Sequence, residues 1–152
     1  MASDNKQVIR RLFEEAWNRG QLEVLEELID PKYQAHDPLL GVLDLKGYRS
    51  SIKSYRTSFS GLNFVIDEMV SDGNVVATRW TARGTHTGPF GALAPTGKTA
   101  EVKGISFSEL KNGKLIRTSS QMDTLGLMQQ LGAAPTLGVP AVKPVIESVA
   151  RL

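Results

Sequence analysis

The chain has 152 residues, of which 41% are hydrophobic and 22% are charged, and its formal net charge is +2. These values predict one globular domain with its own core, and the scattered basic residues argue against a nucleic-acid-binding surface. The absence of cysteine excludes disulfides and thiolate chemistry, and no apolar run is long enough to span a bilayer. We therefore expect a soluble, cytoplasmic protein without nucleic-acid or membrane partners.

The N-terminal third of the chain has the periodicity of helices. Apolar residues recur every three or four positions over residues 3–19, which predicts a first amphipathic helix. A second, short helix is predicted over residues 21–29. The segment 31–41 is interpreted as a turn or a single helical turn, and a third helix is predicted over residues 45–58.

The next part of the chain alternates between apolar and polar residues, which is typical of strands. Two strands joined by a tight turn at residues 72–74 are followed by a Gly/Pro-rich loop at residues 88–98. Two more strands and a last helix complete the pattern. This order predicts the α+β class, in which the N-terminal helices pack on a curved antiparallel sheet and enclose an apolar cavity. We expect the domain to span residues 1–132, with residues 133–152 as a C-terminal tail.

Three side chains are candidate acids or bases. His36 follows the second predicted helix, His86 ends the second predicted strand, and Asp123 closes the fourth. Imidazole is the usual general acid or base near neutral pH, and burial can bring a carboxylate into the same range. Each has a structural alternative, because His36 can bond a turn and Asp123 can cap the helix that follows it. The two histidines are far apart in the sequence, so we expect no metal site, and no cofactor motif occurs.

The end of the fourth predicted strand is polar. Thr118, Ser119, Ser120 and Gln121 stand where a core-facing strand would carry Val, Ile or Leu. This stretch therefore faces either water or a pocket. Aromatic residues are more often core than ligand wall, but they would suit a flat apolar ligand. The candidates for such a wall are Tyr33, Tyr55, Phe59, Trp80 and Phe90.

Four stretches resemble a known family, and they are Thr85 to Gly88, Pro95 to Lys98, Asn112 to Lys114, and Asp123 to Gly132. Together they make the chain similar to the SnoaL-like polyketide cyclases, or ester cyclases, of the nuclear-transport-factor-2-like superfamily. The resemblance covers nearly the whole chain apart from the tail. It implies a cone-shaped α+β barrel with an apolar cavity, in agreement with the predicted order of elements.

The resemblance also points to a change in the catalytic residues. In characterised cyclases of this family, an acid on the last strand and a histidine on the neighbouring strand perform acid/base catalysis in a ring closure. When the chain is matched through its ending at Asp123, the position of the acid is Ser120. Counting back from Asn112 places the histidine position at Ser106. Two hydroxyls therefore replace the titrating pair, and a serine without an adjacent base cannot abstract a carbon-bound proton at neutral pH.

The family likeness implies a cofactor-independent cyclase or isomerase of secondary metabolism that acts on an apolar polyketide or terpenoid substrate. It also implies a homodimer that pairs through the outer face of the sheet. The expected catalytic residues are His36, Asp123 and His86. The expected substrate-binding residues, besides the aromatic ones, are Ser106, Ser120, Gln121 and Met122.

Two other functions stay open on the sequence alone. The first is a non-catalytic domain that binds a small ligand and has lost the family's titrating pair. The second is an enzyme similar to an epoxide hydrolase, which would need two carboxylates and an arginine around a water molecule. Asp67, Arg79 and Asp123 supply the residue types for such a network, but the strand pattern does not place them together.

Overall fold

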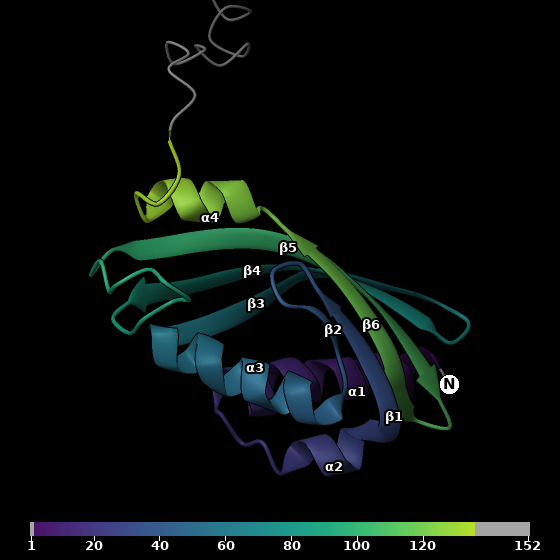
Figure 1. Ribbon diagram of the computed structural model, residues 1–152. Coiled ribbons are helices and arrows are strands. Elements are labelled where there is room, and N and C mark those ends of the chain that lie inside the picture. The colour runs from purple at the N-terminus through teal and green to yellow at the C-terminus, as the bar shows by residue number, and fades with distance from the viewer. Residues whose placement is uncertain (1, 136–152) are drawn as a thin grey trace, which may run out of the picture.

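Helices and a sheet form the layers of the computed structural model, which describes residues 2–135 (Figure 1). Six strands form one sheet in the order β2-β1-β6-β5-β4-β3, and the sheet curves over the N-terminal helices. The helices are α1 (Ala2–Arg11), the π-helix η1 (Leu12–Asn18), α2 (Val24–Leu28), α3 (Leu45–Ser58) and α4 (Thr124–Gln130). The strands are β1 (Ile29–Asp37), β2 (Gly41–Leu43), β3 (Phe59–Asp72), β4 (Val75–His86), β5 (Thr99–Lys111) and β6 (Lys114–Met122). The predicted α+β class is confirmed.

The first predicted helix is one helical segment with two kinds of turn. The α-helix α1 passes directly into η1, and the Arg19 backbone N–H reaches back five residues to the Glu14 carbonyl oxygen at 3.1 Å. The wider turns of a π-helix change which side chains share a face, and such segments are frequent at functional sites. Here Leu12, Phe13 and Trp17 of η1 all line the central cavity.

The strands β3 to β6 form the antiparallel meander that the alternating pattern predicts. Gly73 in the first tight turn has a φ of 55°, and Asn112 and Gly113 in the last have φ values of 51° and 77°. Turns with this left-handed backbone match the right-handed twist of the strands they join. Burial then alternates along β4, so Trp80 faces the helices and Arg79 faces away from them.

The segment that follows α2 corrects the prediction. Residues 31–41 were interpreted as a turn or a helical turn, but most of them belong to β1 and β2. Because β1 pairs with β6 in parallel, the sheet is mixed instead of purely antiparallel. Tyr33 and Ala35 are buried and His36 is exposed, as strand alternation requires. The sequence does not indicate this strand clearly, because the alternation is short and lies close to Pro31, and proline is uncommon inside strands.

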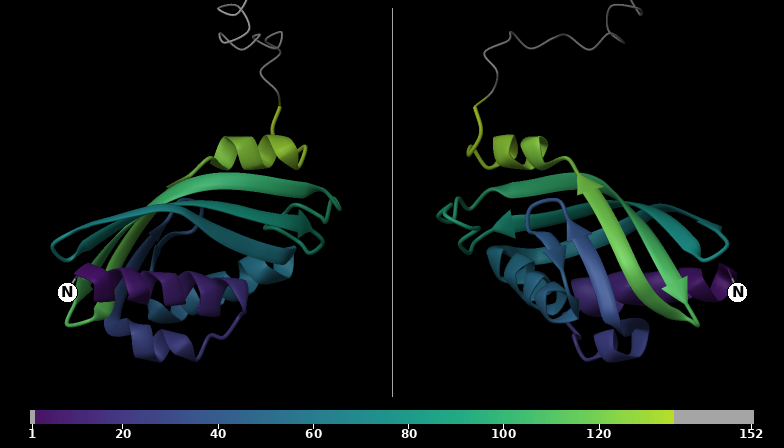
Figure 2. Two further views of the ribbon diagram at one scale, coloured as in Figure 1. Left: turned by 180° about the vertical axis from the view of Figure 1, so that it is seen from behind. Right: turned by 45° about the vertical axis from the view of Figure 1, so that its right-hand side comes forward.

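The C-terminal helix α4 lies against β5, away from the other helices (Figure 2). Its N-terminus is capped by the Asp123 carboxylate, which accepts the Gly126 backbone N–H at 2.9 Å. Near its C-terminus, the Gln130 side chain bonds both backbone groups of Glu101 on β5, at 2.9 and 2.8 Å. Leu127, between these two contacts, is buried and forms part of the cavity wall.

Within residues 2–135, no helix has the length and the apolar character needed to cross a membrane. The expected C-terminal tail, residues 133–152, lies outside the described residues from residue 136 onward.

Candidate active site

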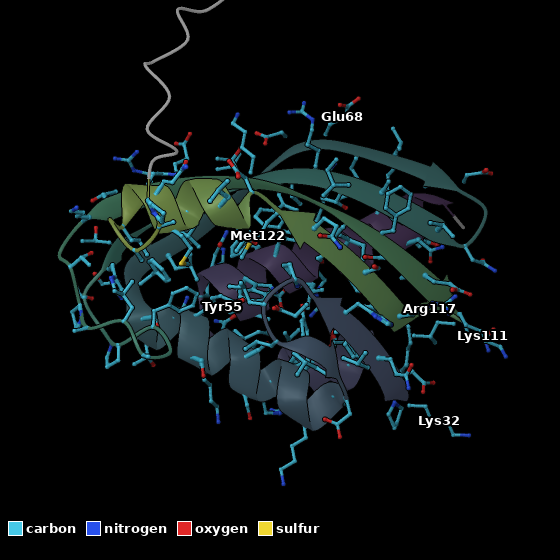
Figure 3. The ribbon with its side chains drawn as sticks, turned by 45° about the horizontal axis from the view of Figure 1, so that its top comes forward. Lys32, Tyr55, Glu68, Lys111, Arg117 and Met122 are labelled. Atoms are coloured by element: carbon cyan, nitrogen blue, oxygen red, sulfur yellow. The ribbon has the colours of Figure 1, made fainter. Side chains whose placement is uncertain are left out.

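A cavity lies between the inner face of the sheet and the helices. About 990 Å³ of space, counting the part that is open to solvent, is not filled by protein atoms. Figure 3 shows Tyr55 of α3 and Met122 of β6 between the sheet and the helices, whereas Glu68, Lys111 and Arg117 point outward.

The walls of the cavity are mainly aromatic. The ring centroid of Trp17 is 6.0 Å from that of Tyr48 and 5.0 Å from that of Phe64. Tyr55 lies 5.9 Å from the same tryptophan, and Trp80 lies 5.1 Å from Phe64. Tilted and edge-on contacts at these distances are favourable for aromatic rings and hold them in place. The cavity therefore presents fixed, flat, apolar surfaces to a ligand.

Hydroxyl groups interrupt this apolar lining along the middle of the sheet. Thr78 of β4 pairs with Ser106 of β5, and Ser106 pairs with Ser120 of β6, so the three residues form one row across three strands. Ser108 of β5 pairs with Thr118 of β6 in a second row. With the exception of Thr78, all of these residues line the cavity.

The polar end of β6 faces both the cavity and the outside. Thr118 and Ser120 line the cavity, while Ser119 and Gln121 alternate with them and are exposed on the outer face. Met122, the next inward-facing residue, also lines the cavity. Of the expected binding residues on this strand, Ser120 and Met122 therefore lie at the site and Gln121 does not.

Ser106 is hydrogen-bonded on two sides. Trp80 Nε1 donates to Ser106 Oγ at 3.0 Å, and the hydroxyl oxygens of Ser106 and Ser120 are 2.8 Å apart. The indole reaches Ser106 by lying directly over Gly104, because a Cβ atom on Gly104 would be 2.2 Å from the ring. Any side chain at Gly104 would displace the indole, so this glycine is needed for the Trp80–Ser106 hydrogen bond.

Several buried hydroxyls near the cavity have no partner. The side-chain oxygens of Tyr33, Thr78 and Thr118 make no hydrogen bond of good geometry within residues 2–135, although the Thr118 hydroxyl lies near enough to Tyr33 to lower the pKa of that phenol. These residues are 1%, 0% and 9% exposed, respectively. A buried hydroxyl without a partner costs about 1–3 kcal/mol, so it usually indicates a ligand or a water molecule. Thr118 lines the cavity and is the one of the three that a ligand can reach.

Asp37 is the only carboxylate among the described residues that line the cavity. Its Oδ1 accepts the backbone N–H groups of Leu39 and Leu40, at 2.8 and 2.9 Å. The Tyr55 hydroxyl donates a longer hydrogen bond to the same carboxylate, 3.3 Å from Oδ1 and 3.4 Å from Oδ2. Within residues 2–135, Oδ2 has no closer donor, so its lone pairs are available to a ligand.

Asp37 and Ser120 both line the cavity from adjacent strands. The strands β1 and β6 are parallel, and His36 lies opposite Ser119 at the end of their paired register. Asp37 and Ser120 are the next residues on each strand, so the wall of the cavity holds a carboxylate on β1 and a hydroxyl on β6.

His36 borders the cavity, but its side chain is exposed. It lies in β1 between Ala35 and Asp37, which face inward, and it pairs with Ser119 on the outer face. Strand alternation therefore directs the imidazole away from the cavity. Asp123 is exposed as well, and its carboxylate caps α4 instead of lining the cavity.

His86 is fully buried and does not line the cavity. Its Nδ1 accepts the Thr96 backbone N–H at 3.2 Å and lies 3.0 Å from Thr96 Oγ1. Because Nδ1 accepts, the neutral ring carries its proton on Nε2, which is buried without a partner in the described part of the chain. The ring also packs on Phe59 at 5.3 Å. The hydrogen bond from Thr96 to His86 therefore holds the loop between β4 and β5 in place.

The remaining aromatic candidates divide between the cavity and its surroundings. Phe59, Tyr55 and Trp80 line the cavity. Tyr33 is buried in the adjoining core, with its ring 5.2 Å from that of Tyr48. Phe90 packs from outside against Tyr55 and Phe59, at 5.9 and 5.2 Å.

The residue types for an epoxide-hydrolase-like network are not brought together. Asp67 accepts a hydrogen bond from Thr81 at 2.6 Å, and Arg79 pairs with Glu68 at 3.4 Å. Neither Asp67 nor Arg79 lines the cavity, and Asp123 is the cap of α4.

Several residues of the cavity are not among the binding residues expected from the sequence, and Trp17, Asp37, Tyr48 and Ser108 are examples. Trp17 and Tyr48 have the spacing of core positions on helices, and a core and a cavity wall share that pattern. The alternation of Tyr33, Ala35 and Asp37 is the signal that could have identified Asp37, had this segment been recognised as a strand.

The comparisons with known proteins agree with this architecture. The profile of the SnoaL-like polyketide cyclase family matches residues 7–131, and the chain belongs to this family. No curated protein sequence matches the chain significantly. Family membership supports a cyclase or an isomerase, without fixing the reaction.

Three solved structures illustrate the likeness. TsrD from Streptomyces laurentii is 25% identical, with a TM-score of 0.79 over 87% of this chain and 97% of that one. IdmH from Streptomyces antibioticus, a candidate polyketide cyclase, is 29% identical, with a TM-score of 0.74 over 84% and 98%. A candidate polyketide cyclase from Acidithiobacillus ferrooxidans is 28% identical, with a TM-score of 0.75 over 87% and 96%.

The three tyrosines of the chain all have raised pKa values. Burial is the main cause for Tyr33, Tyr48 and Tyr55. The neighbouring Tyr48 raises the pKa of Tyr33 further, and the Asp37 carboxylate raises the pKa of Tyr55 further. Each phenol therefore keeps its proton in the folded protein at a pH where an unfolded chain has lost it.

We predict that no tyrosine of the folded protein ionises near pH 10. In the unfolded chain each tyrosine has a pKa of about 10, so above that pH the unfolded state binds fewer protons and the free energy of unfolding falls. The loss is about 1.4 kcal/mol per pH unit for each tyrosine. Tyrosinate absorbance and urea unfolding, measured together across this pH range, check the prediction. Ionisation of one tyrosine near pH 10 without unfolding would contradict it.

Proposed function

We propose that this protein is a cofactor-independent cyclase or isomerase of secondary metabolism. Its substrate is an apolar polyketide or terpenoid that folds within the aromatic cavity and rearranges intramolecularly. The observation that carries the proposal is an apolar cavity that is lined by one carboxylate, Asp37, and by the hydroxyl of Ser120 on the adjacent strand. The naming of similar structures, such as IdmH, as candidate polyketide cyclases supports it.

In this proposal the walls of the cavity contribute to catalysis by selecting one conformation of the substrate. A flexible substrate must fold so that its two reacting atoms meet, and fixed aromatic surfaces favour one folded conformation. Holding reacting groups in such a geometry lowers a barrier by up to roughly 7–11 kcal/mol in well-oriented cases. Displacing water from the same space strengthens each polar contact that remains.

Asp37 is the proton-transfer group in the proposed reaction. Its Oδ2 removes a proton from a nucleophilic carbon or oxygen of the substrate, and the electron pair left on that atom forms the ring bond to an electrophilic carbon. The electron pair displaced from that carbon moves to the oxygen of its carbonyl or epoxide. The proton on Asp37 then passes to this oxygen. Substrate and product therefore contain the same atoms.

The three residues that the sequence led us to expect as catalytic do not carry out the proton transfer in this proposal. The carboxylate of Asp123 is engaged in capping α4, and the ring of His86 is engaged in the loop. His36 is exposed at the border of the cavity, with its imidazole directed to the outer face. The competing function is a ligand-binding domain without catalysis, and the replacement of the titrating pair by Ser106 and Ser120 favours it.

Deletion and complementation of the gene separate these two functions. In the organism that carries the gene, deletion should cause an uncyclised compound to accumulate, with the same mass as the cyclised product that disappears. The wild-type gene should restore the product, and Asp37→Asn should reduce its rate of formation about 100-fold, since general base catalysis contributes about 10²–10⁴. Liquid chromatography with mass spectrometry measures both compounds.

Asp123→Asn is the matched control, because asparagine caps helices about as well as aspartate. It should restore the product as the wild type does. Full restoration by Asp37→Asn would remove the proposed base. Deletion without any new isomer would favour the ligand-binding function.

We also propose that the protein forms a homodimer through the outer face of its sheet. Val65, Ile105 and Phe107 are 53%, 47% and 58% exposed on this face. Positively and negatively charged side chains surround them, and these form the ion pairs Arg79–Glu68, Arg83–Glu101 and Arg117–Glu109. An apolar centre with a rim of mixed charge can pair with a second copy of itself, as a two-fold interface requires.

Light scattering of the purified protein tests the dimer. We expect the mass of two chains for the wild type and of one chain for Phe107→Glu, because a buried unpaired carboxylate opposes association. Val42→Glu, at an exposed position on β2, is the control and should stay dimeric. A monomeric wild type would refute the proposal.

A further inference from the structure

Ser106 has a hydrogen-bond partner on each of two sides and is almost inaccessible. It is 5% exposed, with Trp80 Nε1 at 3.0 Å and Ser120 Oγ at 2.8 Å from its hydroxyl oxygen. No other hydrogen bond of its side chain occurs within residues 2–135. A serine hydroxyl carries one proton to donate and has two lone pairs that accept. The two partners therefore decide where the Ser106 proton lies.

The indole of Trp80 determines the direction of its hydrogen bond with Ser106. An indole N–H only donates, so Ser106 accepts from Trp80 and must place its own proton elsewhere. Ser120 is the remaining partner. If Ser120 donated to Ser106 instead, the proton of Ser106, which lines the cavity but is only 5% exposed, would have no acceptor within residues 2–135, and this is unfavourable. Ser106 therefore donates to Ser120, and the hydrogen bonds run in one direction from Trp80 to Ser106 to Ser120.

This direction leaves the proton of Ser120 free. Ser120 is half-buried and lines the cavity, and its side chain has no hydrogen bond within residues 2–135 except the one with Ser106. Its O–H therefore points to whatever occupies the cavity. Hydrogen bonds in a chain polarise one another, so this O–H is a stronger donor than that of an isolated serine.

A second observation also points to a ligand at this wall. Thr118 faces the cavity from the same strand, two residues before Ser120, and its hydroxyl is buried without a partner in the described chain. On the neighbouring strand, Asp37 supplies an acceptor that lines the same cavity. Donor and acceptor thus lie together in a cavity whose other walls are apolar.

We propose that Ser120 binds an acceptor oxygen of the substrate, and that this contact selects the substrate class. The substrate is an apolar skeleton that carries a carbonyl, ether or epoxide oxygen, with its acidic C–H or O–H group placed toward Asp37. This proposal rests on the proposed function and specifies which atom of the substrate the site holds. A hydrocarbon of the same shape leaves the Ser120 proton unpaired.

Two probes of nearly the same shape test this specificity. 2-Acetylnaphthalene carries a ketone oxygen, and 2-isopropenylnaphthalene has a CH₂ group in its place. Equilibrium dialysis of each probe against the full-length protein gives the two dissociation constants. We expect the wild type to bind the ketone about fivefold more tightly, the value of one neutral hydrogen bond.

Variants of adjacent serines on β6 provide the comparison. Ser120→Ala should bind both probes equally, with the affinity for the hydrocarbon nearly unchanged, and that affinity also reports that the variant is folded. Ser119→Ala removes a hydroxyl from the outer face of the same strand and should keep the wild-type preference. An infrared difference spectrum of the bound ketone, with a labelled carbonyl, should show a lower stretching frequency in the wild type than in Ser120→Ala.

The possible results distinguish this inference from the function on which it rests. Equal binding of both probes by the wild type, or a preference that survives in Ser120→Ala, would overturn the role of Ser120 and leave the apolar cavity as a binding site. If neither probe bound to the wild type, both the role of Ser120 and the apolar cavity site would be contradicted. A ketone preference that Ser120→Ala removes would support the inference, even if gene deletion showed no cyclisation.

Discussion

The hydrogen bond from the Trp80 indole to Ser106 is the interaction on which the polar part of the cavity depends. It exists because Gly104 has no side chain, so that the indole can lie flat across β5. The same indole packs on Phe64 and forms part of the aromatic wall. Trp80 therefore fixes both the shape of the site and, through Ser106, the direction of the hydroxyl at Ser120. A substitution at Gly104 would disturb both properties at once.

The site has a different distribution of charge from the one that the family resemblance implies. At the two positions of the acid and the histidine, this chain has Ser120 and Ser106, so the row across β5 and β6 is neutral. Neutral hydroxyls that bond one another avoid the cost of burying charge in an apolar space. The carboxylate that lines the cavity is instead on the next strand, at Asp37 of β1. In the proposed reaction the donor, Ser120 on β6, and the base, Asp37 on β1, thus lie in the same wall of the cavity.

Periodicity predicted α3 and the strands β3 to β6 because these elements are long and regular. It missed β1, where the alternation is short and close to Pro31, and this error determined which site residues were found. Whether His36 or Asp37 faces the cavity depends only on strand alternation, so a segment interpreted as a turn cannot decide between them. The position of Asp123 before a helix indicated a cap, as observed. The hydrogen bond between Trp80 and Ser106 joins residues of two different strands that are far apart in the sequence. A pattern of neighbouring residues therefore cannot predict it.

Neutron diffraction from crystals grown in heavy water locates the hydroxyl deuterons and so tests the direction of the hydrogen bond between Ser106 and Ser120. We expect the deuteron between Ser106 Oγ and Ser120 Oγ to be bound to Ser106, and the Ser120 deuteron to point into the cavity. A deuteron bound to Ser120 and directed at Ser106 would contradict this expectation, since Ser120 would then have no proton to offer a ligand.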